Sequence, residues 1–144
     1  MKFGLLKDIK AGEYRVALAP AEIATIVADG HQVYVTSGAG AKAGFEDAGY
    51  AEAGATSLPE NADTYATCDF VVKVKELEES EYDLLHEGQI IFTCIHPAAH
   101  PAEVDALLEK KVIAFTAEDS HRFGSPFCEA AGKAGAFLGL WAMM

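Results

Sequence analysis

The feature that most constrains the fold of this chain is a series of short apolar runs that are continuous and do not alternate with polar residues. Such runs lie at Phe3–Leu6, Gln32–Thr36, Phe70–Val74, Gln89–Ile95 and Val112–Phe115. Continuous apolar runs of this length are typical of strands that are covered on both faces, as in a parallel sheet with crossover helices. The chain is therefore expected to fold around a parallel sheet.

Helical patterns lie between these runs. The segment Pro20–Asp29 begins with proline at a first helical position and is followed by Gly30 as a stop signal. A second helical pattern of the same length covers Pro101–Lys110, and a shorter one covers Asp47–Ala53. This alternation predicts the α/β class, with a doubly wound, mostly parallel sheet of the flavodoxin-like type. In such sheets, ligands bind beyond the carboxyl ends of the strands.

Length and charge narrow the class of protein. The chain has 144 residues, which favours one domain, and its 22 acidic residues against 11 Lys and Arg give a formal net charge of −11. This charge repels nucleic acid and anionic membranes, so neither is an expected partner. The three cysteines are widely spaced without a C-x-x-C pair, which fits a reducing compartment. Because no signal peptide and no membrane-spanning apolar run is visible, we expect a cytoplasmic protein.

The last stretch of the chain has a different pattern. Its apolar residues form one stripe at helical spacing: Phe127, Ala130, Ala131, Ala134, Phe137, Leu138 and Trp141. Gly132, Gly135 and Gly139 lie beside the stripe, and each costs an isolated helix roughly 1 kcal/mol relative to alanine. Glycines there suit close packing against another backbone. Two interpretations remain open: a helix that leads into partner structure outside this chain, and a core helix with a frayed end.

A glycine-rich segment matches the relaxed dinucleotide fingerprint G-x-G-x-x-A. It covers Gly38–Ala43 and follows a predicted strand. The fingerprint should open a long helix that receives a pyrophosphate group, but Gly44–Asp47 follows here, with Asp47 as a helix cap. We therefore favour a plain turn over a nucleotide site.

The spacing Cys94-x-His96-x-x-x-His100 contains residue types that bind zinc. Pro97 and Pro101 interrupt the helix on which two histidines four residues apart would share a face. No metal site is expected.

Three residues at the carboxyl ends of predicted strands point to a site for a small acid. Arg15 lies just after the first strand and can hold a carboxylate with two parallel hydrogen bonds. Lys75 ends the third strand, on the same side of the sheet as Lys73 if the strand alternates. His96 ends the next strand, where it can transfer protons near neutral pH. Each residue alone is more often structural or solvent-exposed, and the combination favours the small-acid site.

At these residues the chain resembles the N-terminal half of alanine dehydrogenases and of the related nicotinamide nucleotide transhydrogenases. The matching segments are Lys7–Lys10, Glu13–Pro20, Gly30–His31, Gly38–Gly40, Val72–Glu76, Leu85–Thr93 with His96, and Cys128–Gly132. Together they extend over nearly the whole chain.

The resemblance implies a set of roles. Arg15 and Lys75 would hold the carboxylate and carbonyl of a keto acid, and His96 would be the general acid and base. The reaction would be the reversible oxidative deamination of L-alanine to pyruvate and ammonia, with NAD as the cofactor. Residues 1–125 would form the substrate-binding domain. Residues 126–144 would connect it to a separate Rossmann domain that this chain lacks, so the chain alone should be inactive.

The resemblance also leaves alternatives. Phe127 occupies the position where the family would place a methionine near the nicotinamide, which makes it a candidate cofactor contact. A transhydrogenase alpha subunit, an opine or saccharopine type of amino-acid dehydrogenase and a non-catalytic keto-acid-binding module share the scaffold. The expected partners are a small amino or keto acid, an NAD-binding domain and further copies of the chain in a homo-oligomer.

Overall fold

The computed structural model describes residues 1–118, 120 and 125–144, and for residues 126 and 127 it describes the backbone alone. The strands are β1 (Lys2–Leu5), β2 (Gln32–Thr36), β3 (Thr56–Leu58), β4 (Phe70–Val72), β5 (Ile90–Thr93) and β6 (Ile113–Thr116). The helices are α1 (Pro20–Ala28), α2 (Asp47–Glu52), α3 (Asn61–Thr67), α4 (Pro101–Glu109) and α5 (Pro126–Ala142), with short 3-10 helices η1 (Ala41–Ala43) and η2 (Glu79–Leu84).

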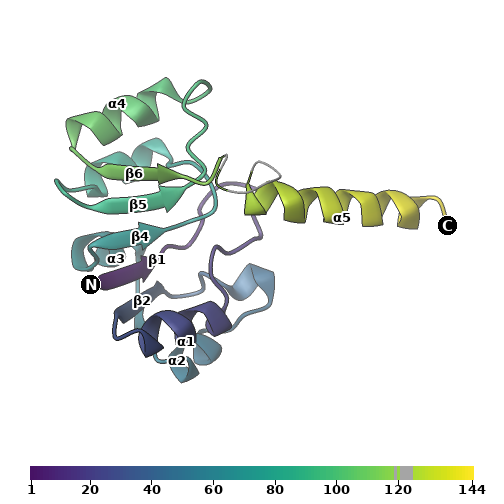
Figure 1. Cartoon of the computed structure of the whole chain (residues 1–144), viewed down its shortest axis with the longest axis horizontal. Helices are drawn as coiled ribbons and strands as arrows, with labels where there is room; N and C mark the ends of the chain where they lie inside the picture. Colours follow the sequence, from purple (N-terminus) through teal and green to yellow (C-terminus); the bar gives the residue numbers. More distant parts are fainter. Residues whose placement is uncertain (119, 121–124) are drawn as a thin grey trace.

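The strands form one sheet in which every pair is parallel (Figure 1). Their order is β3-β2-β1-β4-β5-β6, so the chain winds outward from β1 in one direction and then from β4 in the other. This confirms the doubly wound α/β fold. The strand order is the one found in nucleotide-binding doubly wound sheets. It differs from the order 2-1-3-4-5 of the flavodoxin-like type that was expected from the sequence. The point where the winding reverses lies between β1 and β4, which is where ligands bind in such folds.

Two apolar clusters fill the space between the sheet and its helices. One contains Ile23 of α1 and Tyr50 of α2, which pack on Val33 and Val35 of β2. The other contains Tyr65 of α3 and Leu107 of α4, together with Leu85 after η2, against the central strands. Helices α1 and α2 thus cover one face of the sheet, and α3 and α4 cover the other. This arrangement follows because all crossovers have the same hand while the chain reverses its direction of winding at the switch point.

The expected elements agree with the observed ones to within about two residues at each end, but β3 and α3 were not predicted. Strand β3 is a three-residue edge strand, Thr56–Leu58, without a buried side chain. Helix α3 has the polar sequence NADTYAT and buries only Thr64 and Tyr65. Neither segment is long or apolar enough to show a period. Strand β3 forms by pairing with β2, and α3 packs on β1 and β2.

The glycine-rich segment after β2 is a turn followed by η1, as expected. The backbone N–H of Gly38 donates to Asp47 Oδ1 at 2.8 Å, and the Ser37 hydroxyl donates to Asp47 Oδ2 at 2.6 Å. A Cβ at Gly40 would lie 2.5 Å from the Tyr50 hydroxyl, so glycine is required there for packing. The Gly38 N–H, one of the donors that would cradle a phosphate, is thus engaged by a carboxylate of the same domain.

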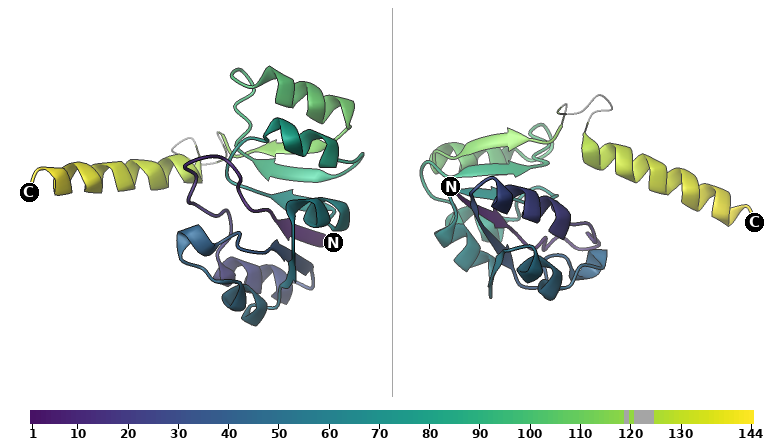
Figure 2. Two further views of the ribbon diagram at one scale, coloured as in Figure 1. Left: turned by 180° about the vertical axis from the view of Figure 1, so that it is seen from behind. Right: turned by 60° about the horizontal axis from the view of Figure 1, so that its bottom comes forward.

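Helix α5 extends away from the sheet (Figure 2). It exposes large apolar side chains, among them Phe137, Leu140 and Trp141. Apart from neighbouring residues of the helix itself, no described atom lies within 4 Å of the position that a Cβ would take at Gly132, Gly135 or Gly139. Ile113 and Phe115 of β6 are also about half exposed, at 50% and 54%. Among the residues that the structure describes, no helix has both the length and the apolarity needed to span a membrane.

Candidate active site

The carboxyl ends of the strands face the side from which α5 departs (Figure 1). A pocket of about 220 Å³ opens there between the loops after β1, β4 and β5 and the first turns of α5. Its lining consists of Arg15, Lys75, Cys94, His96, Ser125, Cys128 and Ala131. The three residues predicted from the sequence to bind a small acid therefore line one pocket, beside the switch point between β1 and β4.

Arg15 is positioned by a carboxylate two residues before it. Its Nε donates to Glu13 Oε1 at 2.8 Å and its Nη2 donates to Glu13 Oε2 at 2.6 Å. The same carboxylate accepts the backbone N–H groups of Tyr14 and Arg15. The hydrogen bond from the Arg15 side chain contributes most, and together these hydrogen bonds lower the pKa of Glu13 to about 2. Glu13 therefore stays ionised and fixes the plane of a guanidinium that is 38% exposed at the pocket.

Lys75 is held by its backbone, and its side chain reaches the pocket. Its N–H donates to Asp8 Oδ2 at 2.9 Å, and its carbonyl accepts from the Thr93 hydroxyl at 2.6 Å. Its ammonium lies 3.8 Å from a carboxylate oxygen of Glu76, and the side chain is 29% exposed. The loops after β1 and β4 and the last residue of β5 are thus tied together at the position of this lysine.

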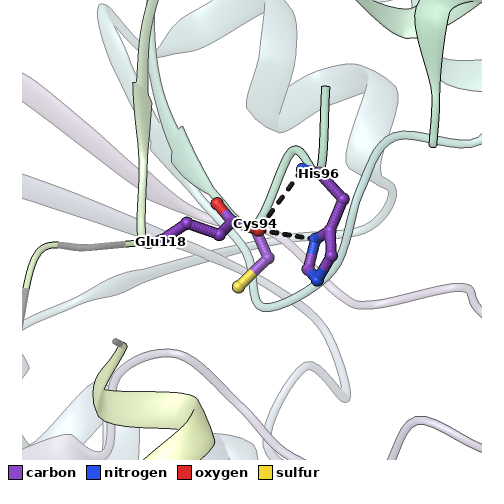
Figure 3. A group of neighbouring side chains, drawn as sticks. All are labelled: Cys94, His96 and Glu118. Atoms are coloured by element: carbon purple, nitrogen blue, oxygen red, sulfur yellow. Dashed lines mark hydrogen bonds and ion pairs between the residues drawn. The ribbon is translucent and has the colours of Figure 1, made fainter. Parts of the chain in front are cut away.

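His96 is positioned by Glu118, which follows β6 (Figure 3). The Glu118 carboxylate lies 2.5 Å from His96 Nδ1 and accepts the backbone N–H groups of Ile95 and His96 at 3.4 and 3.3 Å. His96 has a left-handed backbone conformation with φ 51°. Residues other than glycine rarely adopt it, and such strain is concentrated at functional sites. Its side chain is 45% exposed, so the ring contacts both Glu118 and solvent.

Cys94 lies beneath this histidine, buried at 5% exposure. Burial raises the pKa of its thiol to about 11, and the nearby Glu118 carboxylate adds to the effect. Ligand atoms of Cys94, His96 and Glu118 all lie within 4.8 Å of one another. Cys128 lines the same pocket from α5 and is exposed.

Other residues singled out in the sequence lie elsewhere. Strand β4 ends at Val72, so Lys73 and Lys75 do not follow strand alternation, and Lys73 is buried in an ion pair with Glu81 at 2.6 Å. His100 lines a separate pocket of about 430 Å³ and lies 3.6 Å from Glu76. The Phe127 side chain, proposed as a cofactor contact, lies outside the described residues.

Sequence reasoning missed the acidic partners Glu13, Glu118 and Asp8. For Glu13 a signal was present, because a carboxylate two residues before a candidate binding arginine can reach its guanidinium. Glu118 and His96 are separated by 22 residues, and only the pairing of β5 with β6 brings them together.

The fold and the pocket define a class: a doubly wound α/β domain with cationic side chains and a histidine at its switch point. A comparison with known families makes this more specific. The family described as "Alanine dehydrogenase/PNT, N-terminal domain" matches residues 4–124, and the chain belongs to this family.

Individual relatives agree with the family. The chain is 39% identical to the alanine dehydrogenase of Methanococcus maripaludis and to alanine dehydrogenase 2 of Staphylococcus aureus, in each case over 96% of the chain and 39% of the relative. It therefore spans about two fifths of the length of these relatives.

Solved structures show the same fold. An L-alanine dehydrogenase superposes with a TM-score of 0.79 at 39% identity, covering 82% of this chain and 32% of that one. A transhydrogenase from Sinorhizobium meliloti also gives 0.79, at 24% identity over 85% of this chain and 36% of that one, which supports the fold alone.

Proposed function

We propose that this chain is the substrate-binding and proton-transferring part of an NAD-dependent L-alanine dehydrogenase. The observation that carries the proposal is that Arg15, Lys75 and His96 line one pocket at the carboxyl edge of the sheet. Relatives that bear the name alanine dehydrogenase support the choice of reaction. The reaction is the reversible oxidative deamination of L-alanine to pyruvate and ammonia.

Arg15 and Lys75 bind the acid. Glu13 accepts hydrogen bonds from Nε and Nη2 of the Arg15 guanidinium. Glu13 therefore sets the orientation of Arg15 toward a carboxylate, while the ammonium of Lys75 polarises the carbonyl of the keto acid. The volume of about 220 Å³ suits an acid with a short side chain.

His96 exchanges protons. Contact between Nδ1 and the Glu118 carboxylate selects the tautomer with the proton on Nδ1. The other ring nitrogen, Nε2, therefore takes a proton from the water molecule that attacks the imine, and Nε2 returns this proton in the reverse reaction. The left-handed backbone of His96 holds the ring in this position.

NAD, bound by a separate domain, would accept the hydride from the substrate. In the glycine-rich turn the Gly38 N–H, which a pyrophosphate would need as a donor, is bonded to Asp47. We propose residues 1–125 as the substrate domain and residues 126–144 as the connection to the NAD-binding domain. The exposed apolar residues of α5 support this division.

The test uses the complete polypeptide or complex to which this chain belongs. We expect NADH oxidation that depends on both pyruvate and ammonium, with the reverse reaction on L-alanine, and no activity from residues 1–144 alone. Oxidation with a larger keto acid in preference to pyruvate would reassign the substrate. Hydride exchange between two nucleotides without any keto acid would favour a transhydrogenase and contradict the proposal.

A further inference from the structure

The group formed by Cys94, His96 and Glu118 goes beyond what the proposed reaction uses (Figure 3). Proton transfer requires His96 and an acceptor for Nδ1, but it gives no role to a thiol. Cys94 nevertheless brings its sulfur within 4.8 Å of ligand atoms of both other residues. The three side chains come from the end of β5 and the end of β6, two neighbouring strands of the sheet.

We propose that Cys94, His96 and Glu118 form a binding site for Zn²⁺. Thiolate, imidazole and carboxylate are the three protein ligand types that Zn²⁺ accepts. A site with three protein ligands leaves the fourth tetrahedral position open to water, and the 45% exposure of His96 leaves access from solvent.

The geometry requires small movements only. Ligand atoms in a tetrahedral zinc site lie roughly 3.3–3.7 Å apart, as follows from bond lengths of about 2.0–2.3 Å. Cys94, His96 and Glu118 start within 4.8 Å of one another, so rotations of the side chains suffice. The His96–Glu118 contact of 2.5 Å opens as the metal takes the position between the two groups.

The surroundings of the carboxylate resemble those of a metal ligand. Glu118 accepts the backbone N–H groups of Ile95 and His96, and its own N–H donates to the Thr116 hydroxyl at 3.3 Å. Hydrogen bonds of this kind orient the side chains that bind the metal directly, and they are a usual part of metal sites. The left-handed backbone of His96 adds a further constraint on where its ring can lie.

Binding exchanges a proton for the metal. The Cys94 S–H bond breaks, the sulfur becomes a thiolate that binds Zn²⁺, and the proton passes to solvent. Because the proposed function assigns proton transfer to His96, occupancy by zinc would also block that step. This consequence rests on the proposed function, whereas binding of the metal does not.

The experiment measures metal binding to the chain of 144 residues without any assay of activity. We expect calorimetric titration with Zn²⁺ to give one site, and titration with Co²⁺ to give a thiolate-to-cobalt charge-transfer band. Cys94→Ala and His96→Gln should each weaken Zn²⁺ binding at least about 100-fold, more than is typical for loss of an outer hydrogen bond. Cys94→Ala should also abolish the charge-transfer band.

Matched variants separate this site from its neighbours. Cys128→Ala removes the other thiol that lines the pocket, and His100→Gln removes a histidine outside it, and both should bind Zn²⁺ as the unmodified chain does. If Cys94→Ala does not fold, as judged by circular dichroism, Glu118→Gln at the partly exposed edge provides the test. Absence of Zn²⁺ binding, a cobalt complex without the thiolate band, or equal loss in Cys128→Ala would overturn the proposal. None of these results bears on whether His96 transfers protons.

Discussion

Lys73 and Lys75 are two residues apart in the sequence, and they illustrate two uses of a charge in this domain. Lys73 is fully buried, with its ammonium 2.6 Å from Glu81, and the Tyr65 hydroxyl donates to the same carboxylate. Lys75 has its backbone fixed by Asp8, but its side chain is 29% exposed at the pocket. The interior group thus has permanent partners, whereas the group at the pocket can exchange water for a ligand.

The same contrast applies to carboxylates. Glu13 at the pocket has its pKa lowered to about 2, mainly by the hydrogen bond from Arg15. Glu103 in the interior has its pKa raised to about 7, mainly by burial. From this comparison we expect substitutions of the interior charges to change stability, and substitutions of the charges around the pocket to change the proposed activity.

The largest effect is expected for His96→Ala in the complete enzyme. General acid–base catalysis contributes about 10²–10⁴-fold, so turnover should fall by about this factor while the free energy of unfolding changes little. His100→Ala is the matched control and should keep near-normal turnover. Steady-state kinetics with circular dichroism provide the measurement. Comparable losses in the two variants would show that the pocket does not distinguish the histidines.

Lys73→Met should act on stability. It leaves the Glu81 carboxylate buried without its cation, which costs about 3–5 kcal/mol in the free energy of unfolding. Lys75→Met should cost less than about 1 kcal/mol, since its ion pair is partly exposed. The double variant Lys73→Met/Glu81→Gln should recover much of the loss. Urea denaturation measures all three, and equal losses at the two lysines would contradict the comparison.

Glu103 should make stability depend on pH. Its carboxyl group is fully buried, with Oε1 accepting from the Leu77 N–H at 2.8 Å, and Lys73 lowers its pKa while Glu81 and Glu118 raise it. Because the pKa of Glu103 is about 7 in the folded state and the ordinary pKa of a glutamic acid side chain is 4.5, the folded state holds the proton more tightly. Stability therefore falls as the pH rises from about 4.5 to 7, by about 3 kcal/mol.

Glu103→Gln keeps an acceptor for Leu77 and cannot ionise. We expect this variant to lose the pH dependence between 4.5 and 7 and to be more stable than the unmodified chain at pH 8. Urea denaturation at several pH values gives the comparison. If both proteins show the same pH dependence, another group is responsible.

The smallest effects concern the acid-binding side chains. Arg15→Ala and Lys75→Ala in the complete enzyme should each weaken pyruvate binding by about 10- to 100-fold, because a hydrogen bond to a charged group contributes about 1.5–3 kcal/mol. The Michaelis constant for NADH should change little. Kinetics at varied pyruvate and varied NADH distinguish the two. A change in the NADH constant alone would remove these residues from the acid site.

Much of the fold was predictable because its signals are local. The apolar runs predicted β1, β2, β4, β5 and β6 to within about two residues, and Pro20 and Pro101 marked the starts of α1 and α4. Strand β3 and helix α3 have no such signal, since β3 forms by pairing with β2 and α3 by packing on β1 and β2. Strand order was not predictable either, because it depends on how crossovers pack and not on any single segment.

For the site, the sequence by itself determined that Arg15, Lys75 and His96 follow parallel strands, and parallel strands bring their carboxyl ends to one edge. Only the tertiary structure decided which carboxylate pairs with which cationic or histidine side chain. Glu118 pairs with His96, and Glu81 pairs with Lys73 and not with Lys75. The physical reason is that strand periodicity is encoded within a few residues, whereas an ion pair depends on which distant segments exclude water together.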